Sequence, residues 1–121
     1  MVNISHEVKT ESIKSFQSTI RKCENALDQM TKKGANTTLL KKRLKALQIG
    51  LAMLENVWHQ QPHPYTQKEL AEARHVLIGL LPSIEKIYAK SKEGSPQKTL
   101  LERRIKAINL SVQAIDDFTK Q

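Results

Sequence analysis

The sequence predicts an all-α protein, folded as an antiparallel up-and-down four-helix bundle in one domain that covers residues 1–121. Apolar residues recur at spacings of three and four in four separate segments, which is the period of a helix with one buried face. Gly or Pro residues interrupt the chain between these segments. Aromatic residues make up only 4% of the chain, and runs of β-branched residues are few, which argues against a sheet.

We expect helices at residues 8–33, 38–59, 67–92 and 96–119. Gly34 marks the end of the first helix, because Gly readily takes the left-handed conformation that stops a helix. Pro62 and Pro64 forbid continuation of the second helix. Short loops between long helices favour antiparallel neighbours in an up-and-down bundle. The alternative is a pair of hairpins that open out and are completed by a second chain.

The second half of the chain has the clearest helix starts. Thr66 and Glu69 have the spacing of a capping box, in which each side chain accepts a backbone N–H of the other residue. Ser95 is the expected cap of the last helix, and Pro96 stands in its first turn, where proline is tolerated. Pro82 lies inside the third helix and removes one backbone hydrogen bond, so we expect a kink or a brief break near it.

An internal repeat relates the two halves. Residues 38–49 align with residues 99–110 at an offset of 61, with Thr, Leu, Leu, Arg, Lys and Ala identical in one register. The chain is therefore predicted to consist of two related helical hairpins, residues 8–59 and residues 67–119. The alternative is that two amphipathic helices resemble each other without a common origin.

A second apolar strip runs along the second and fourth predicted helices, away from their main buried stripe. Either these two helices are simply the more buried pair, or the strip is an exposed surface that binds a partner or a second copy. The candidate partner-binding residues on this strip are Leu39, Ile49, Met53, Leu100, Leu110 and Phe118.

The chain contains 20 Lys and Arg residues against 12 Asp and Glu residues, a net charge of +8. Segments 30–45 and 86–106 together hold thirteen of the basic residues and only two acids, and an up-and-down bundle places their loops at the same end. Free helix N–H groups beside clustered Lys and Arg favour anions. The alternative is a solvated basic end without a ligand. The candidate anion-binding residues are Lys41, Lys42, Arg43, Lys45, Arg103, Arg104 and Lys106.

No motif for catalysis or metal binding is present in the sequence. His59 and His63 are four residues apart, but Pro62 between them breaks the helical face that a metal site would need. Cys23 lies on the buried stripe of the first helix, where cysteine is usually an inert small apolar residue. We therefore expect no enzyme activity, no catalytic residue, no cofactor and no metal.

The single cysteine excludes an internal disulfide and suits a reducing compartment. No apolar stretch approaches the roughly 18 residues that span a bilayer, and residues 1–15 lack the apolar region of a signal peptide. We expect a cytoplasmic protein without membrane contact.

The segment Pro64-Tyr65-Thr66-Gln67-Lys68-Glu69-Leu70, the chain's size and its basic helical character resemble the YppE-like family. The likeness covers mainly residues 55–115. The resemblance implies a small cytoplasmic Firmicutes protein with a four-helix up-and-down bundle and no assigned activity.

The sequence leaves two functions open. The first is a non-catalytic protein-interaction module that binds a protein partner or a second copy of itself. The alternative is a nucleic-acid or polyanion binder that uses the basic end without reading sequence.

Overall fold

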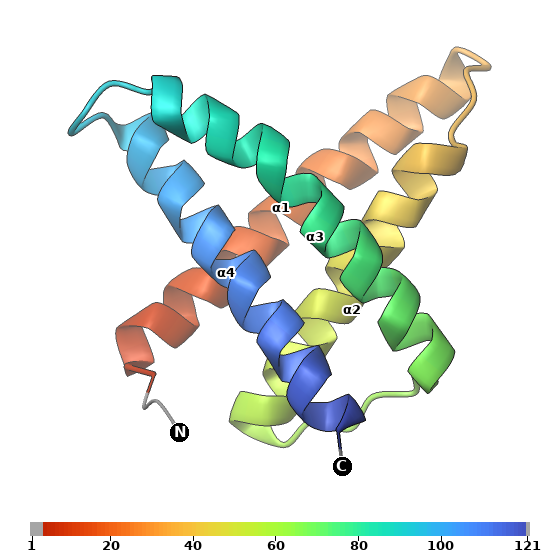
Figure 1. Ribbon diagram of the computed structural model, residues 1–121. Coiled ribbons are helices and arrows are strands. Elements are labelled where there is room, and N and C mark those ends of the chain that lie inside the picture. Colours follow the sequence, from red (N-terminus) through yellow and green to blue (C-terminus); the bar gives the residue numbers. More distant parts are fainter. Residues whose placement is uncertain (1–3, 121) are drawn as a thin grey trace.

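The computed structural model describes residues 4–120 and consists of four α-helices (Figure 1). They are α1 (His6–Lys32), α2 (Thr38–His59), α3 (Gln67–Lys90) and α4 (Pro96–Thr119). The described residues include no strand, so the predicted all-α, four-helix class is confirmed. The predicted helix ends differ from the observed ones by at most two residues.

Side-chain caps fix where three of the helices begin. The Ser5 hydroxyl accepts a backbone N–H in the first turn of α1 at 3.1 Å, so α1 starts two residues earlier than predicted. The Thr66 hydroxyl accepts the N–H of Glu69 at 3.1 Å, and the Glu69 carboxylate accepts the N–H of Thr66 at 3.0 Å. Ser95 caps α4 in the same way as Ser5 caps α1.

Helix α3 continues through Pro82 from Gln67 to Lys90, so the brief break admitted by the sequence is not present. The carbonyl of Ile78 loses its usual N–H donor at this point. Both Ile78 and Pro82 are exposed, which leaves this carbonyl within reach of water. A kink in α3 stays a prediction.

The helices form two layers, hairpin 1 (α1 and α2) and hairpin 2 (α3 and α4) (Figure 1). Within each hairpin the two helices run side by side in opposite directions. The two hairpins cross like the strokes of an X, with their connecting loops at opposite upper corners. A bundle of the predicted kind has all four helix axes close to parallel, so the crossing is a difference from the expected arrangement. Within residues 4–120, no Cα atom of α1 lies within 8 Å of a Cα atom of α3, whereas α2 approaches every other helix this closely.

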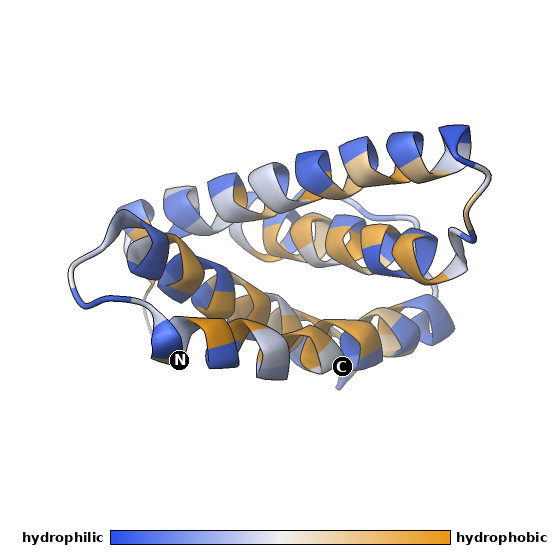
Figure 2. Ribbon diagram, turned by 90° about the horizontal axis from the view of Figure 1, so that it is seen from above, coloured by the Kyte–Doolittle hydropathy of each residue, from blue (hydrophilic) through white to orange (hydrophobic). Residues whose placement is uncertain are grey.

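The core lies where the hairpins cross, and Gly50 of α2 makes the close approach possible. A Cβ atom on Gly50 would lie 2.9 Å from the ring of Phe16 on α1 and 3.3 Å from the side chain of Leu77 on α3. Ser111, the counterpart of Gly50 at the repeat offset of 61, is also fully buried. Seen from above, the apolar sides of the two hairpins face each other (Figure 2).

The two hairpins bury equivalent positions of the repeat. Residues that are 61 positions apart are buried together in both halves, which relates the hairpins by an approximate two-fold axis. These buried pairs are Phe16 and Leu77, Ala46 and Ala107, Leu47 and Ile108, and Leu54 and Ile115.

Aromatic side chains pack together where the segment between α2 and α3 meets the end of α4, near the lower end of the ribbon in Figure 1. The ring of His63 meets the ring of Phe118 edge-on, with 4.7 Å between their centroids, and stacks on Tyr65 at 6.0 Å. We call these three residues the lower aromatic cluster. Nearby, the guanidinium of Arg74 on α3 binds the carboxylate of Asp116 on α4 through two hydrogen bonds, of 2.6 and 3.2 Å.

Candidate functional site

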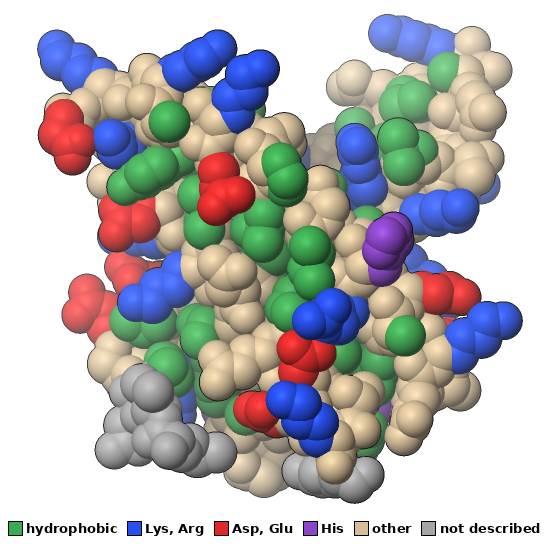
Figure 3. Space-filling model, viewed as in Figure 1, with side chains coloured by type: hydrophobic (Ala, Val, Ile, Leu, Met, Phe, Trp, Pro, Cys, Tyr) green, Lys and Arg blue, Asp and Glu red, His purple; other side chains and the backbone are tan. Residues whose placement is uncertain are grey.

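The excess positive charge is confined to the loop ends of the two hairpins. We call these ends the first arm (residues 24–46) and the second arm (residues 85–107). Each arm has a net charge of +4, and the rest of the chain is neutral by the same count. Figure 3 shows Lys and Arg side chains toward the tips of both arms, with open space between them. Because the crossing holds the arms apart, the basic residues do not form the single pole that the sequence predicts.

The seven predicted anion-binding residues divide among separate places. Arg43 and Arg104 line one notch between the arms. Lys42 and Lys45 line a different hollow between α2 and α3. Arg103 turns away from both and contacts α1. The structure therefore brings only one pair of equivalent arginines together.

All four helices contribute to the notch, which has a volume of about 300 Å³. Its lining residues are Thr19, Lys22, Cys23, Arg43, Leu47, Leu80, Ile84, Arg104 and Ile108. Most of these residues form pairs 61 positions apart, so the notch lies at the approximate two-fold axis between the hairpins. The pairs are Thr19 and Leu80, Cys23 and Ile84, Arg43 and Arg104, and Leu47 and Ile108.

Three cations line the notch and no carboxylate does: Lys22, Arg43 and Arg104. None of the three forms an ion pair within residues 4–120. The Nε atom of Arg104 is shielded from water and has no hydrogen-bond partner. A guanidinium offers only donors, and a buried donor without an acceptor costs about 1–3 kcal/mol.

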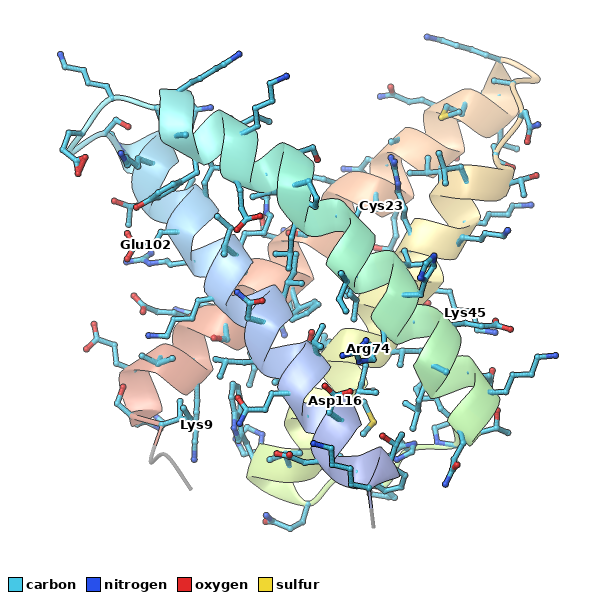
Figure 4. The ribbon with its side chains drawn as sticks, in the orientation of Figure 1. Lys9, Cys23, Lys45, Arg74, Glu102 and Asp116 are labelled. Carbon is cyan, nitrogen blue, oxygen red and sulfur yellow. The ribbon has the colours of Figure 1, made fainter. Side chains whose placement is uncertain are left out.

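Cys23 lies where the arms part, as its label in Figure 4 shows. Its thiol donates to the carbonyl oxygen of Leu40, with 3.7 Å between sulfur and oxygen. Burial raises the pKa of the Cys23 thiol, and the nearby charge of Arg43 offsets only part of this effect. A raised pKa favours the protonated form of the thiol at neutral pH, and this form is the weaker nucleophile.

The hollow between α2 and α3 has a volume of about 400 Å³ and a rim of both charges. The ammonium of Lys45 binds the carboxylate of Glu69 at 3.1 Å. The Thr66 backbone N–H and the Lys45 ammonium both donate to this carboxylate and lower the pKa of Glu69. Glu72 also lies on the rim, beside Lys42. Because acids balance its cations, this hollow lacks the uncompensated positive charge of the notch.

The repeat-equivalent position between α1 and α4 is held by an ion pair. Arg103 binds Glu11 there, with 2.8 Å between nitrogen and oxygen. Arg103 therefore joins the two hairpins, and the expectation that it belongs to a free anion-binding surface is corrected. The two remaining candidates, Lys41 and Lys106, are exposed on the arms and form no ion pair among the described residues.

The second apolar strip is largely buried, which corrects the predicted partner-binding surface. Ile49 and Met53 are at most 1% exposed and belong to the core at the crossing. Leu110 packs against the same core, and Phe118 belongs to the lower aromatic cluster. The remaining two residues, at repeat-equivalent positions on the arms, do lie open. Leu39 and Leu100 are 60% and 58% exposed.

Sequence reasoning named both notch arginines but did not single them out as a pair. The repeat contains the signal, because Arg43 and Arg104 occupy the same position in the two hairpins. Their meeting at one notch depends on how the two hairpins pack together, which the spacing of residues along one helix does not specify. The apolar residues of the notch looked like ordinary core positions in the sequence, and Lys22 stood outside both basic segments.

No family model matches the sequence, and comparisons with curated proteins and with solved structures give no match. The resemblance to the YppE-like family therefore stays a prediction. No helix within residues 4–120 is both long and apolar enough to cross a membrane. In the same range, no three His, Cys, Asp or Glu side chains gather in a way that could hold a metal ion.

Proposed function

We propose that the protein is a non-catalytic binding module for polyanions, with the phosphate backbone of nucleic acids as its ligand class. The observation that carries the proposal is the pair of basic arms held apart around a notch with three cations and no carboxylate. An extended ligand with regularly spaced negative charges contacts both arms at once. A single small anion leaves most of the basic residues on the arms without a contact.

Binding through these residues does not read sequence. Contacts between Lys or Arg and phosphate position a nucleic acid without specifying its bases. The exposed large apolar residues are aliphatic, and no aromatic platform for stacking bases is among them. The expected ligand is therefore recognised by charge density, and its affinity falls steeply as salt concentration rises.

A titration followed by fluorescence anisotropy tests this proposal, with single-stranded DNA, duplex DNA and RNA at low salt. The double variant K41E with K90E reverses the charge of one exposed lysine on each arm. It therefore lowers the positive electrostatic potential on both sides of the notch. The expected loss of affinity is about tenfold or more, because several phosphate contacts are affected. Arg103 is left unchanged in this variant, since its reversal would also break the ion pair with Glu11.

The matched control makes the same change of net charge outside the arms. K14E with K68E alters two exposed lysines that form no ion pair within the described residues. Affinity of this variant is expected to stay within about threefold of the original protein, because neither lysine belongs to the arms or lines the notch, so few phosphate contacts change. Equal losses in both variants, or a wild-type Kd weaker than about 10⁻⁴ M at low salt, contradict the proposal.

Self-association is a second candidate function, favoured by the exposure of Leu39 and Leu100. Two large aliphatic side chains at repeat-equivalent positions are open on the arms, although most of their strip is buried. Isolated exposed apolar residues are common, so the measurement must be direct. Sedimentation of the wild type and of L39Q with L100Q decides: a dimer that the double variant loses supports this function. A monomer at the highest accessible concentration contradicts it.

A further inference from the structure

The notch combines two surfaces that nucleic-acid binding does not require together. Its rim has the three unpaired cations Lys22, Arg43 and Arg104, whereas its interior is aliphatic. Leu47 and Ile108 are at most 3% exposed and form part of the buried core. A polyanion that lies across the arms contacts the rim and leaves this apolar interior uncovered.

The aliphatic wall on hairpin 2 is open to a ligand. Leu80 and Ile84 of α3 line the notch and are only partly buried, although both pack against the core. Together with Leu47 and Ile108, they make up the aliphatic part of the notch lining. Partly exposed aliphatic groups gain about 25 cal/mol for each Å² that a ligand removes from water.

From these two surfaces we infer that the notch is a binding site for a small amphiphilic anion, with a phosphate or carboxylate head and a short aliphatic tail. The head accepts hydrogen bonds from the guanidinium groups of Arg43 and Arg104, and Lys22 adds a third positive charge. Guanidinium groups suit such heads because their donors match the spacing of the anion's oxygens. The tail covers Leu80 and Ile84.

The size of the notch limits the tail. A volume of about 300 Å³ is at the lower end of the range for small-molecule sites. The site therefore takes one short chain and excludes a two-chain lipid from complete burial. It also stands apart from nucleic-acid binding, since its ligand is small and one part of it is uncharged. A negative result with oligonucleotides leaves this inference intact.

Calorimetric titration of the whole chain with octyl phosphate tests the site, with three partial ligands for comparison. Inorganic phosphate supplies the head alone, 1-octanol the tail alone, and octyltrimethylammonium the same tail with the opposite charge. Octyl phosphate is expected to bind about tenfold tighter than any of the three, because only it satisfies both surfaces. Octanoate is expected to behave like octyl phosphate, since the shared chemistry is an oxyanion on an aliphatic chain.

Matched variants locate the binding on the notch. R43Q removes one guanidinium from an exposed position and is expected to lower the affinity for octyl phosphate about tenfold, which corresponds to the free energy of one charge-assisted hydrogen bond. L80Q is expected to lower this affinity about fourfold or more, which corresponds to the free energy of burying one methylene. The controls K42Q and I78Q likewise replace a cation and an aliphatic residue by glutamine, but at positions outside the notch. They are expected to leave the affinity for octyl phosphate within about twofold of the original value, as surface changes away from the site do.

The methyl signals of the protein give a second, independent readout. In carbon–proton spectra, octyl phosphate is expected to move the methyl resonances of Leu80 and Ile84 and to leave those of Leu39 and Leu100 in place. Octyl phosphate that binds no tighter than inorganic phosphate overturns the inference. Equal weakening by R43Q and K42Q also overturns it, because the effect would then come from overall charge.

Discussion

The same four helices form two different ends. Below the crossing, Arg74 and Asp116 form a double hydrogen bond (Figure 4), and the rings of the lower aromatic cluster pack together. Above the crossing, the arms diverge, their cations outnumber their acids, and the notch between them stays open. The excess positive charge therefore lies at the end where the hairpins part, whereas the rest of the chain is neutral by count.

The core at the crossing joins the two hairpins, so a substitution there is expected to have the largest effect on the free energy of unfolding. Phe16 is 2% exposed and packs beside Gly50 at the centre of the core. F16A is expected to lower the free energy of unfolding by about 3–5 kcal/mol, since it removes buried apolar contacts and leaves a cavity. Urea denaturation followed by circular dichroism measures the change. The control L39A, at an exposed position of an arm, is expected to stay within about 0.5 kcal/mol.

Substitution of two glycines by alanine compares a tightly packed position at the crossing with an open position on a helix surface. G50A places a methyl group 2.9 Å from the Phe16 ring, and we expect a loss of about 1–3 kcal/mol in unfolding free energy from overpacking. At Gly79, nothing lies within 4 Å of an added Cβ, so G79A is expected to raise stability by about 0.4–1 kcal/mol. Both values come from the same denaturation experiment. Similar effects at the two sites would contradict the close approach of the hairpins at Gly50.

Removal of one positive charge is expected to act in opposite directions at the two ends. R74Q breaks the ion pair with Asp116 below the crossing and is expected to lower the melting temperature slightly. R43Q removes a cation that has no ion pair among the described residues, and it is expected to leave the melting temperature unchanged or slightly higher. Scanning calorimetry at low salt measures both. A decrease in both variants would mean that the arms contain stabilising charge interactions.

The capping box gives the smallest expected effect, through its dependence on pH. Hydrogen bonds from the Thr66 backbone and from Lys45 lower the pKa of Glu69 from its ordinary value of 4.5. A lowered carboxyl pKa stabilises the folded state above the ordinary value, and this stabilisation is lost as pH falls through the folded-state pKa. E69Q is therefore expected to lose less stability than the wild type between neutral pH and the acid range. The control E102Q changes an exposed arm residue and is expected to keep the wild-type acid dependence.

The helices could be predicted closely because their signals are local. A capping residue, a glycine or a proline marks most helix ends, and each acts on its own few neighbours. The crossing could not be predicted in the same way. It depends on what faces Gly50 from two other helices, and sequence spacing along one helix does not contain that information.

The candidate site was predictable only in part, for the same reason. Arg43 and Arg104 were identified by charge and are related by the repeat, but their approach to one notch follows from the angle between the hairpins. Ile49 and Met53 were expected on a strip that is either buried or exposed, and the crossing buries both. Periodicity places a residue on a face of its helix, whereas only the partner that covers this face decides its exposure.

Within residues 4–120, the backbones of α1 and α3 stay apart, with no pair of Cα atoms within 8 Å, and this has a consequence for the order of folding. Each hairpin consists of neighbouring helices joined by a short loop, so its internal contacts are close in sequence and form fast. Association of the hairpins requires contacts between distant parts of the chain, and each of these involves α2 or α4. We therefore expect the hairpins to behave as two cooperative units that dock late. Amide hydrogens near Gly50 and Ser111 are expected to exchange most slowly, because only separation of the two units exposes them.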